Sequence, residues 1–176
     1  AKGSAALAKK ISKSISSVKV GLDREWGIDH GSWSVLKNMY PVPDMPILQL
    51  SLDYQLSLGK IFRIGKELSS LRKKGLLIIG SGNIVHNLMV MRQDQRPYRW
   101  AADFDAFVKS CLKHKDHKAL INYADHPSSS LALPTNEHYL PLIYCIGAAF
   151  GENAEFFNEK IVYGSVSMLC AVLGKN

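Results

Sequence analysis

The chain has 176 residues, of which 47% are hydrophobic and 21% charged, as in a soluble globular protein long enough to bury a core. Its apolar runs, such as 76–80 and 140–150, are too short or too interrupted to span a bilayer, and its first residues lack the apolar stretch of a signal peptide. We therefore expect one cytoplasmic domain over residues 1–176, with no membrane partner.

The net charge of +7 raises the question of nucleic-acid binding. The basic residues fall mainly on two predicted helices, within 2–13 and 60–74, at the spacing of a solvated helix face. No aromatic RNA-binding motif or zinc-finger spacing accompanies them. The three cysteines are far apart, so they indicate neither a zinc clamp nor a disulfide framework. This pattern favours a reduced compartment and no nucleic-acid partner.

Helical and extended patterns alternate along the chain. The first half predicts helices over 4–16, from 32 toward 40 and over 56–74, with strands over 18–22, 47–52 and 76–79. The second half predicts a surface loop over 92–100, helices over 103–112, 118–123 and 137–150, a flexible connection at 128–130, and one or two strands within 160–173. This order predicts the α/β class, with a central, mostly parallel or mixed sheet flanked by helices.

Three of the six histidines lie in segments whose glycine, proline and asparagine residues indicate loops: His30, His86 and His138. Neutral imidazole is the commonest metal ligand and the commonest acid or base near neutral pH. His30 precedes a predicted helix, and Asp29 beside it could orient either the imidazole or the loop. Glu137 adjoins His138, so one of the two could reach a metal while the other supports it. His126 is a weaker candidate for the same pocket.

His86 is the sharpest of these candidates because it follows the apolar strand predicted at 76–79. Ligands of open α/β sheets bind beyond the carboxyl ends of strands, and Gly80 and Gly82 would let the backbone approach a ligand closely. The alternative is a packed histidine that is hydrogen-bonded to backbone. Gly80 and Gly82 also imitate the start of a dinucleotide-binding motif, although Val85 stands where its third glycine belongs. A nucleotide-binding α/β protein therefore remains an alternative.

Several short, distinctive segments are spread in order over nearly the whole chain. They are Asp29-His30-Gly31-Ser32-Trp33, Met39-Tyr40-Pro41, Gln49-Leu50-Ser51-Leu52-Asp53, Ser81-Gly82-Asn83-Ile84-Val85-His86-Asn87-Leu88, Asn122-Tyr123 with Asp125-His126, Pro134-Thr135 with Glu137-His138-Tyr139-Leu140-Pro141-Leu142, and Gly164-Ser165-Val166-Ser167-Met168. Together they resemble the DOPA-type extradiol dioxygenases of the class III, LigB-like family of ring-cleaving enzymes.

The resemblance implies an α/β fold around a mononuclear non-haem Fe(II) or Zn(II) site, and cleavage of a catechol such as DOPA beside its hydroxyls with O₂. It implies that the metal is bound by His86 and His138 and that His30 and His86 are catalytic. The implied substrate contacts are Asp29, Trp33, His126 and Glu137. The division of ligand and acid/base roles among the three histidines stays open, as does the choice of metal. A homo-oligomer is compatible with the sequence.

The sequence departs from the family in one respect. The family carries two further metal-binding histidines ahead of this region, in Gly-His-Gly-Ser and Ser-Ala-His-Trp segments, and neither segment occurs here. We therefore expect the domain to be incomplete at its N-terminus. Three ligands on one face are the usual minimum for non-haem Fe(II), so His86 and His138 alone should bind metal weakly. A degenerate, non-catalytic relative that acts as a binding protein is the alternative.

Overall fold

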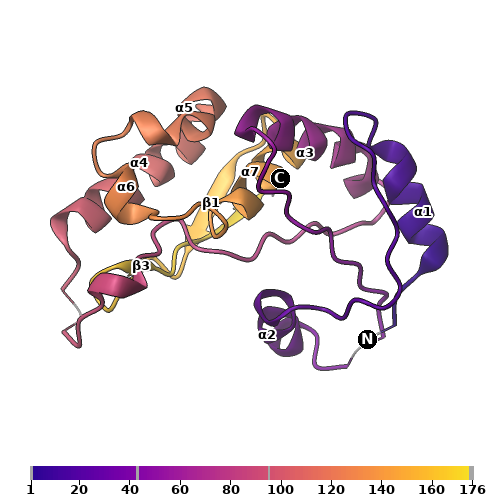
Figure 1. Ribbon diagram of the computed structural model, residues 1–176, viewed down its shortest axis with the longest axis horizontal. Coiled ribbons are helices and arrows are strands. Elements are labelled where there is room, and N and C mark those ends of the chain that lie inside the picture. Colours follow the sequence, from indigo (N-terminus) through magenta and orange to yellow (C-terminus); the bar gives the residue numbers. More distant parts are fainter. Residues whose placement is uncertain (1, 43, 95, 175–176) are drawn as a thin grey trace.

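The computed structural model describes residues 2–42, 44–94 and 96–174 (Figure 1). The helices are α1 (Ala5–Ser14), α2 (His30–Met39), α3 (Leu58–Arg72), α4 (Arg99–His114), α5 (His117–Ile121), α6 (Ser129–Ala132) and α7 (Leu140–Ala148), with 3₁₀ turns η1 (Leu88–Val90) and η2 (Tyr123–Asp125). The strands are β1 (Ala154–Phe157), β2 (Ile161–Val162), β3 (Val166–Ser167) and β4 (Cys170–Leu173). Antiparallel pairs form between β1 and β4 and between β2 and β3. The predicted mixed α/β class is confirmed.

The predicted helices are present, with three differences at their starts. Helix α7 begins at Leu140, so Glu137 and His138 lie in a turn ahead of it and not inside the helix predicted over 137–150. The carboxylate of Asp29 accepts the backbone N–H of Ser32 over 2.8 Å, so α2 begins at His30 and its cap is Asp29 rather than Ser32. The helix α4 begins at Arg99, inside the segment predicted as a surface loop. A further correction concerns the predicted flexible connection at 128–130, because α6 begins within it at Ser129, whose hydroxyl donates to the carbonyl oxygen of Ala124 over 3.1 Å.

The central sheet is where the prediction fails. The segments 18–22, 47–52 and 76–79 contain no strand, and no backbone hydrogen bond joins any two of them within the described ranges. Leu76 and Ile78 pack against the core while Leu77 and Ile79 are exposed, so this segment is extended but covered on one face only. An extended segment becomes a strand only where a neighbouring segment completes its hydrogen-bond ladder.

The helices α3 and α7 cross at two glycines in the middle of the molecule, with α4, α5 and α6 gathered at one end and α1 and α2 toward the other (Figure 1). A Cβ atom at Gly65 would lie 2.3 Å from the carbonyl oxygen of Tyr144, and one at Gly147 would lie 2.3 Å from that of Phe62. Glycine therefore permits a backbone approach that any side chain would block. This crossing packs α7 against α3, and α7 begins two residues after His138.

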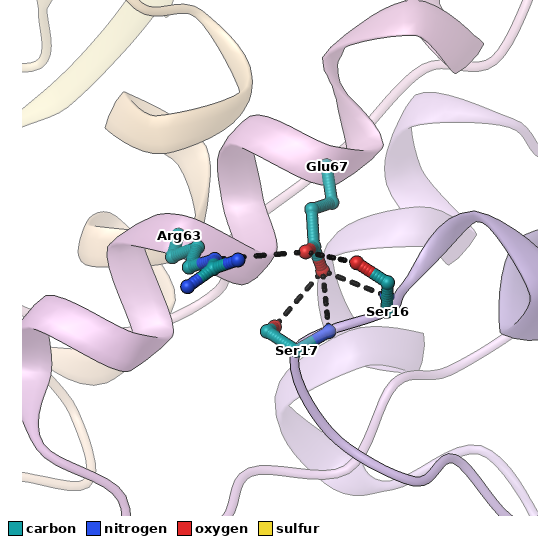
Figure 2. Close-up of polar contacts among 4 residues, drawn as sticks. All are labelled: Ser16, Ser17, Arg63 and Glu67. Carbon is teal, nitrogen blue, oxygen red and sulfur yellow. Dashed lines mark hydrogen bonds and ion pairs between the residues drawn. The ribbon is translucent and has the colours of Figure 1, made fainter.

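A single carboxylate joins the end of α1 to α3 (Figure 2). Glu67 accepts hydrogen bonds from the hydroxyl groups of Ser16 and Ser17, over 2.8 and 2.9 Å, and from both of their backbone N–H groups, while Arg63 lies 3.8 Å away. Burial raises the pKa of Glu67, but the hydrogen bonds from the two serines outweigh it and leave the pKa below its usual value. Among the described residues, every helix is too short or too polar to cross a bilayer.

Candidate functional site

The loop 80–87 carries His86 and contacts the segments of the other two candidate histidines, His30 and His138. The hydroxyl of Ser81 donates to the carbonyl oxygen of Gly31 over 2.6 Å, next to His30. The backbone N–H of Asn83 donates to the carbonyl oxygen of His138 over 3.0 Å. Because the loop itself carries His86, one stretch of backbone gathers segments that lie far apart in the sequence.

The imidazole rings of His86 and His138 stack face to face. Their centroids are 3.5 Å apart, with an angle of 15° between the ring planes. Burial lowers the pKa of His86, and the positive charge that His138 can carry lowers it further, whereas the nearby carboxylate of Glu137 raises it. The net shift is downward, so His86 is a neutral imidazole at neutral pH and can accept a proton.

Glu137 lies beside this pair as an ionised carboxylate. Burial raises its pKa, but the hydroxyl of Thr135, which donates to the carboxylate over 2.6 Å, and the charges of the two histidines lower it below the usual value. A proton that reaches His86 is therefore placed near a negative charge, which stabilises the imidazolium form.

His30 is the first residue of α2, where its ring meets the indole of Trp33 edge to face at a centroid distance of 5.4 Å. The hydrogen bonds of Asp29 go to other groups, although its charge and that of His30 attract each other. The carboxylate of Asp29 caps α2 and accepts the side-chain amide of Gln49 over 2.5 Å, while the backbone N–H of Asp29 donates to the Gln49 amide oxygen over 2.9 Å. Asp29 thus shapes the loop, and both Asp29 and Trp33 are exposed, so both stay predicted substrate contacts.

His126 makes its contacts outside this group. Its ring lies against those of Phe107 and Phe104 of α4, at centroid distances of 4.6 and 5.4 Å, and its Nδ1 accepts the backbone N–H of Ser128 over 3.2 Å. Within the described part of the chain it has no contact with the three histidine segments. Its assignment as a substrate contact stays a prediction.

The donor set has the right chemistry for iron or zinc, because both metals accept imidazole. However, the described residues contain no group of three or more His, Cys, Asp or Glu side chains that could hold a metal ion. In addition, stacked rings direct their nitrogens along nearly parallel planes, whereas two ligands of one ion point at a common centre. His86 and His138 as arranged here therefore do not form a mononuclear metal centre by themselves.

The sequence does not indicate the roles of two side-chain amides that support the site, those of Gln49 and Asn83. The side-chain amide of Gln49 holds Asp29, and that of Asn83 donates to the carbonyl oxygen of Ser167 over 2.7 Å. Both residues lie in segments that the sequence singles out, yet an amide's partner depends on the fold. The available signal is an asparagine in a glycine-containing loop a few residues before a histidine.

Comparison with known proteins gives the family. The family described as the catalytic LigB subunit of aromatic ring-opening dioxygenase matches residues 1–174. A 4,5-DOPA dioxygenase extradiol of Escherichia coli K12 is 42% identical over 181 residues, covering 99% of this chain and 67% of that protein. A protein of the same name from Beta vulgaris is 36% identical over 140 residues, covering 77% of this chain and 51% of that protein.

A solved structure gives the same result. The crystal structure of uncharacterized protein JW3007 from Escherichia coli K12 matches with a TM-score of 0.90 at 42% identity, covering 98% of this chain and 73% of that chain. The chain thus spans about half to two thirds of the length of the curated relatives it matches. The resemblance and the enzyme class that the sequence indicates are confirmed: the chain belongs to the LigB family of extradiol, aromatic ring-opening dioxygenases.

Proposed function

We propose that the protein acts in the extradiol cleavage of a catechol-type aromatic ring by O₂, with DOPA as the representative substrate. The names of the relatives from Escherichia coli and Beta vulgaris support this assignment. The structural observation that carries it is the stacked pair of His86 and His138, held on a loop that also contacts the His30 segment.

The residues of this chain can handle the protons of the reaction. A catechol must lose a hydroxyl proton before its ring reacts, and the neutral imidazole of His86 is a suitable acceptor because burial keeps its pKa low. Glu137 stabilises the resulting charge on His86. His30 is the second candidate acid or base, and the indole of Trp33 offers an aromatic face to the substrate ring.

Enzymes of this family use a non-haem metal, and Fe(II) or Zn(II) is the proposed cofactor. Binding by His86 and His138 would require that the stack open and that further donors join the two imidazoles. We therefore derive the role of His86 from proton transfer alone.

The test is O₂ uptake together with formation of a yellow ring-opened product, on addition of DOPA or 4-methylcatechol to protein reconstituted with Fe(II). His86→Ala should lower kcat by on the order of 10²-fold or more, as loss of a proton-transfer group does. His114→Ala is the matched control, because His114 is exposed at the end of α4 and, among the described residues, its ring hydrogen-bonds to Ser110 of its own helix. Normal turnover by the His86 variant, or no turnover of any catechol by the unaltered protein, would contradict the proposal.

A non-catalytic binding protein is the second candidate. The lack of a three-donor metal group among the described residues favours it. Calorimetric binding of catechol without O₂ uptake in the Fe(II)-loaded protein would support this candidate over the first.

The nucleotide-binding alternative loses its basis. A Cβ at Gly80 would lie 2.7 Å from the sulfur of Cys145, and one at Gly82 would lie 2.1 Å from the carbonyl oxygen of His138. Both glycines therefore permit close packing of the chain around α7. Neither one opens a helix, as the dinucleotide-binding motif requires.

A further inference from the structure

A buried polar cluster lies behind His86, on the side of the backbone that β3 covers. Ser165 and Ser167 are almost fully buried, with exposed fractions of 0% and 1%, and Asp105 of α4 reaches Ser167 from the helix. The hydroxyl of Ser167 donates to the carboxylate of Asp105 and accepts the backbone N–H of Leu169 over 3.1 Å. Both capacities of this hydroxyl are therefore used, and its orientation is fixed.

The strand β3 and Ser165 hold the backbone on both sides of His86. The N–H of Ser167 donates to the carbonyl oxygen of Val85 over 3.0 Å. On the other side, the N–H of Asn87 donates to the carbonyl oxygen of Ser165 over 3.2 Å, and the hydroxyl of Ser165 donates back to the carbonyl oxygen of Asn87 over 2.7 Å. His86 itself stands opposite Val166 in an antiparallel bridge.

The strand that supports the backbone around His86 is short, so each hydrogen bond to it matters for its position. The strand β3 has two residues, and among the described residues its one regular ladder is with β2, which also has two. A strand of that length has too few ladder hydrogen bonds to fix its own position. The contact between Ser167 and Asp105 joins β3 to α4, a helix of 16 residues with a buried apolar face.

Placing a carboxylate at position 105 is energetically unfavourable because the side chain is partly buried. Burial raises the pKa of its carboxyl group; the hydrogen bond from Ser167 and the charge of Lys109 offset this only in part, and the carboxylate of Glu159 adds to the rise. An amide or a hydroxyl could accept the same hydrogen bond at lower cost. The hydrogen bond that Asp105 accepts from Ser167 therefore contributes more to the position of β3 than to stability, and any side-chain oxygen at this place could accept it.

We propose that Asp105 is a positioning residue for His86: through Ser167 it fixes β3, and β3 fixes the backbone around His86 so that its ring stands against that of His138. This inference deepens the proposed function, because the acid/base role of His86 depends on where its ring stands. It rests on that function only for its effect on catalysis, and the geometry can be measured without turnover.

The experiment follows the ring protons of His86 and His138 by NMR at one pH, about 8, where unperturbed imidazoles are neutral. Stacked rings displace each other's proton signals upfield, so both should lie upfield of the signal of exposed His114. In Asp105→Ala most of this displacement should disappear. In Asp105→Asn, which keeps an oxygen acceptor for Ser167, it should return.

Asp103→Ala is the matched control. Asp103 lies on the same helix, its side chain is 55% exposed, and its ionic partner is Arg99 at 3.8 Å, so its loss should leave both ring signals in place. If Asp105→Ala fails to fold, Ser167→Ala removes the other half of the contact and should show the same loss of displacement.

Catalysis gives the second measurement. With active protein, Asp105→Ala should lower kcat on the order of 10²-fold, as a misplacement of about 1 Å does, while KM changes little and Asp105→Asn restores the rate. Unshifted ring signals in a folded Asp105→Ala or Ser167→Ala, or no upfield displacement in the unaltered protein, would overturn the inference. Displaced signals in a protein that turns over no catechol would instead support the positioning and contradict the proposed function.

Discussion

Gly82 gives the sharpest test of the site geometry. Its φ is not positive, so the backbone itself would accept alanine, but the added Cβ would lie 2.1 Å from the carbonyl oxygen of His138. Real Cβ contacts essentially never fall below 3.0 Å, so this oxygen and the loop must separate by about 0.9 Å. Gly82→Ala therefore pushes His138 away from the loop that carries His86.

Three effects set the magnitude for Gly82→Ala. Overpacking of this kind costs about 1–3 kcal/mol. The separation also weakens the hydrogen bond from the N–H of Asn83 to the carbonyl oxygen of His138, now 3.0 Å long, which contributes about 1 kcal/mol. Alanine restricts the unfolded chain and returns about 0.4–1 kcal/mol. We expect a net loss of about 2 kcal/mol in the free energy of unfolding.

The assay is urea denaturation at equilibrium, read as a lower midpoint with an unchanged slope. Gly31→Ala is the control: its Cβ would meet Asp29 and Ser81 side chains at 3.6 and 3.7 Å, which is ordinary contact, and it lies within α2. This variant should be as stable as the unaltered protein or more so. A Gly82→Ala protein that matches Gly31→Ala in stability would refute the close approach of the loop to His138.

Three further predictions concern packing and pH. Gly65→Ala should destabilise by about 2 kcal/mol in urea denaturation because it forces α3 from α7, whereas Gly59→Ala, with open space in the same helix, should be neutral or stabilising; equal midpoints would contradict the crossing. Burial raises the pKa of Asp105, so the folded state holds its proton more tightly and stability falls as pH rises from 3.8 through the raised pKa. Asp105→Asn should remove that fall. Its urea midpoint should exceed that of the unaltered protein at pH 7, but not at pH values below 3.8. Equal dependence of the two midpoints on pH would contradict this. The pKa of Glu67 is lowered, so its stabilisation is present above 4.5 and disappears as pH falls through the lowered value; Glu67→Gln should flatten this acid loss in thermal denaturation, and an unchanged acid limb would count against it.

The helices could be predicted because their signal is local. In α3 the buried residues Ile61, Ile64, Leu68 and Leu71 recur at helical spacing, and that period needs no knowledge of the partner helix. The sheet could not be predicted in the same way. Four consecutive apolar residues from Leu76 to Ile79 show that the backbone can be extended, but whether it pairs depends on which segments lie beside it.

In the candidate site, too, local features could be predicted from the sequence and features that depend on distant residues could not. The resemblance brought His30, His86 and His138 together in one prediction, and the loop contacts of Ser81 and Asn83 agree with that grouping. The stacking of two of the rings was not predictable, because a ring's direction is set by packing that residues distant in sequence provide. The importance of Asp105 was equally hidden, since α4 carries no segment of the family pattern.

The turn that follows His86 separates what is fixed from what is free. Side chains of Leu88 and Met89 are 56% and 91% exposed, while the amide of Asn87 accepts the N–H of Met89 over 3.2 Å and donates to the carbonyl oxygen of Leu131 over 2.8 Å. The side-chain amide of Asn87 holds the backbone of this turn, whereas the side chains of Leu88 and Met89 extend into solvent. Substitutions at Leu88 and Met89 should therefore alter the surface that follows His86 along the chain at little cost in stability.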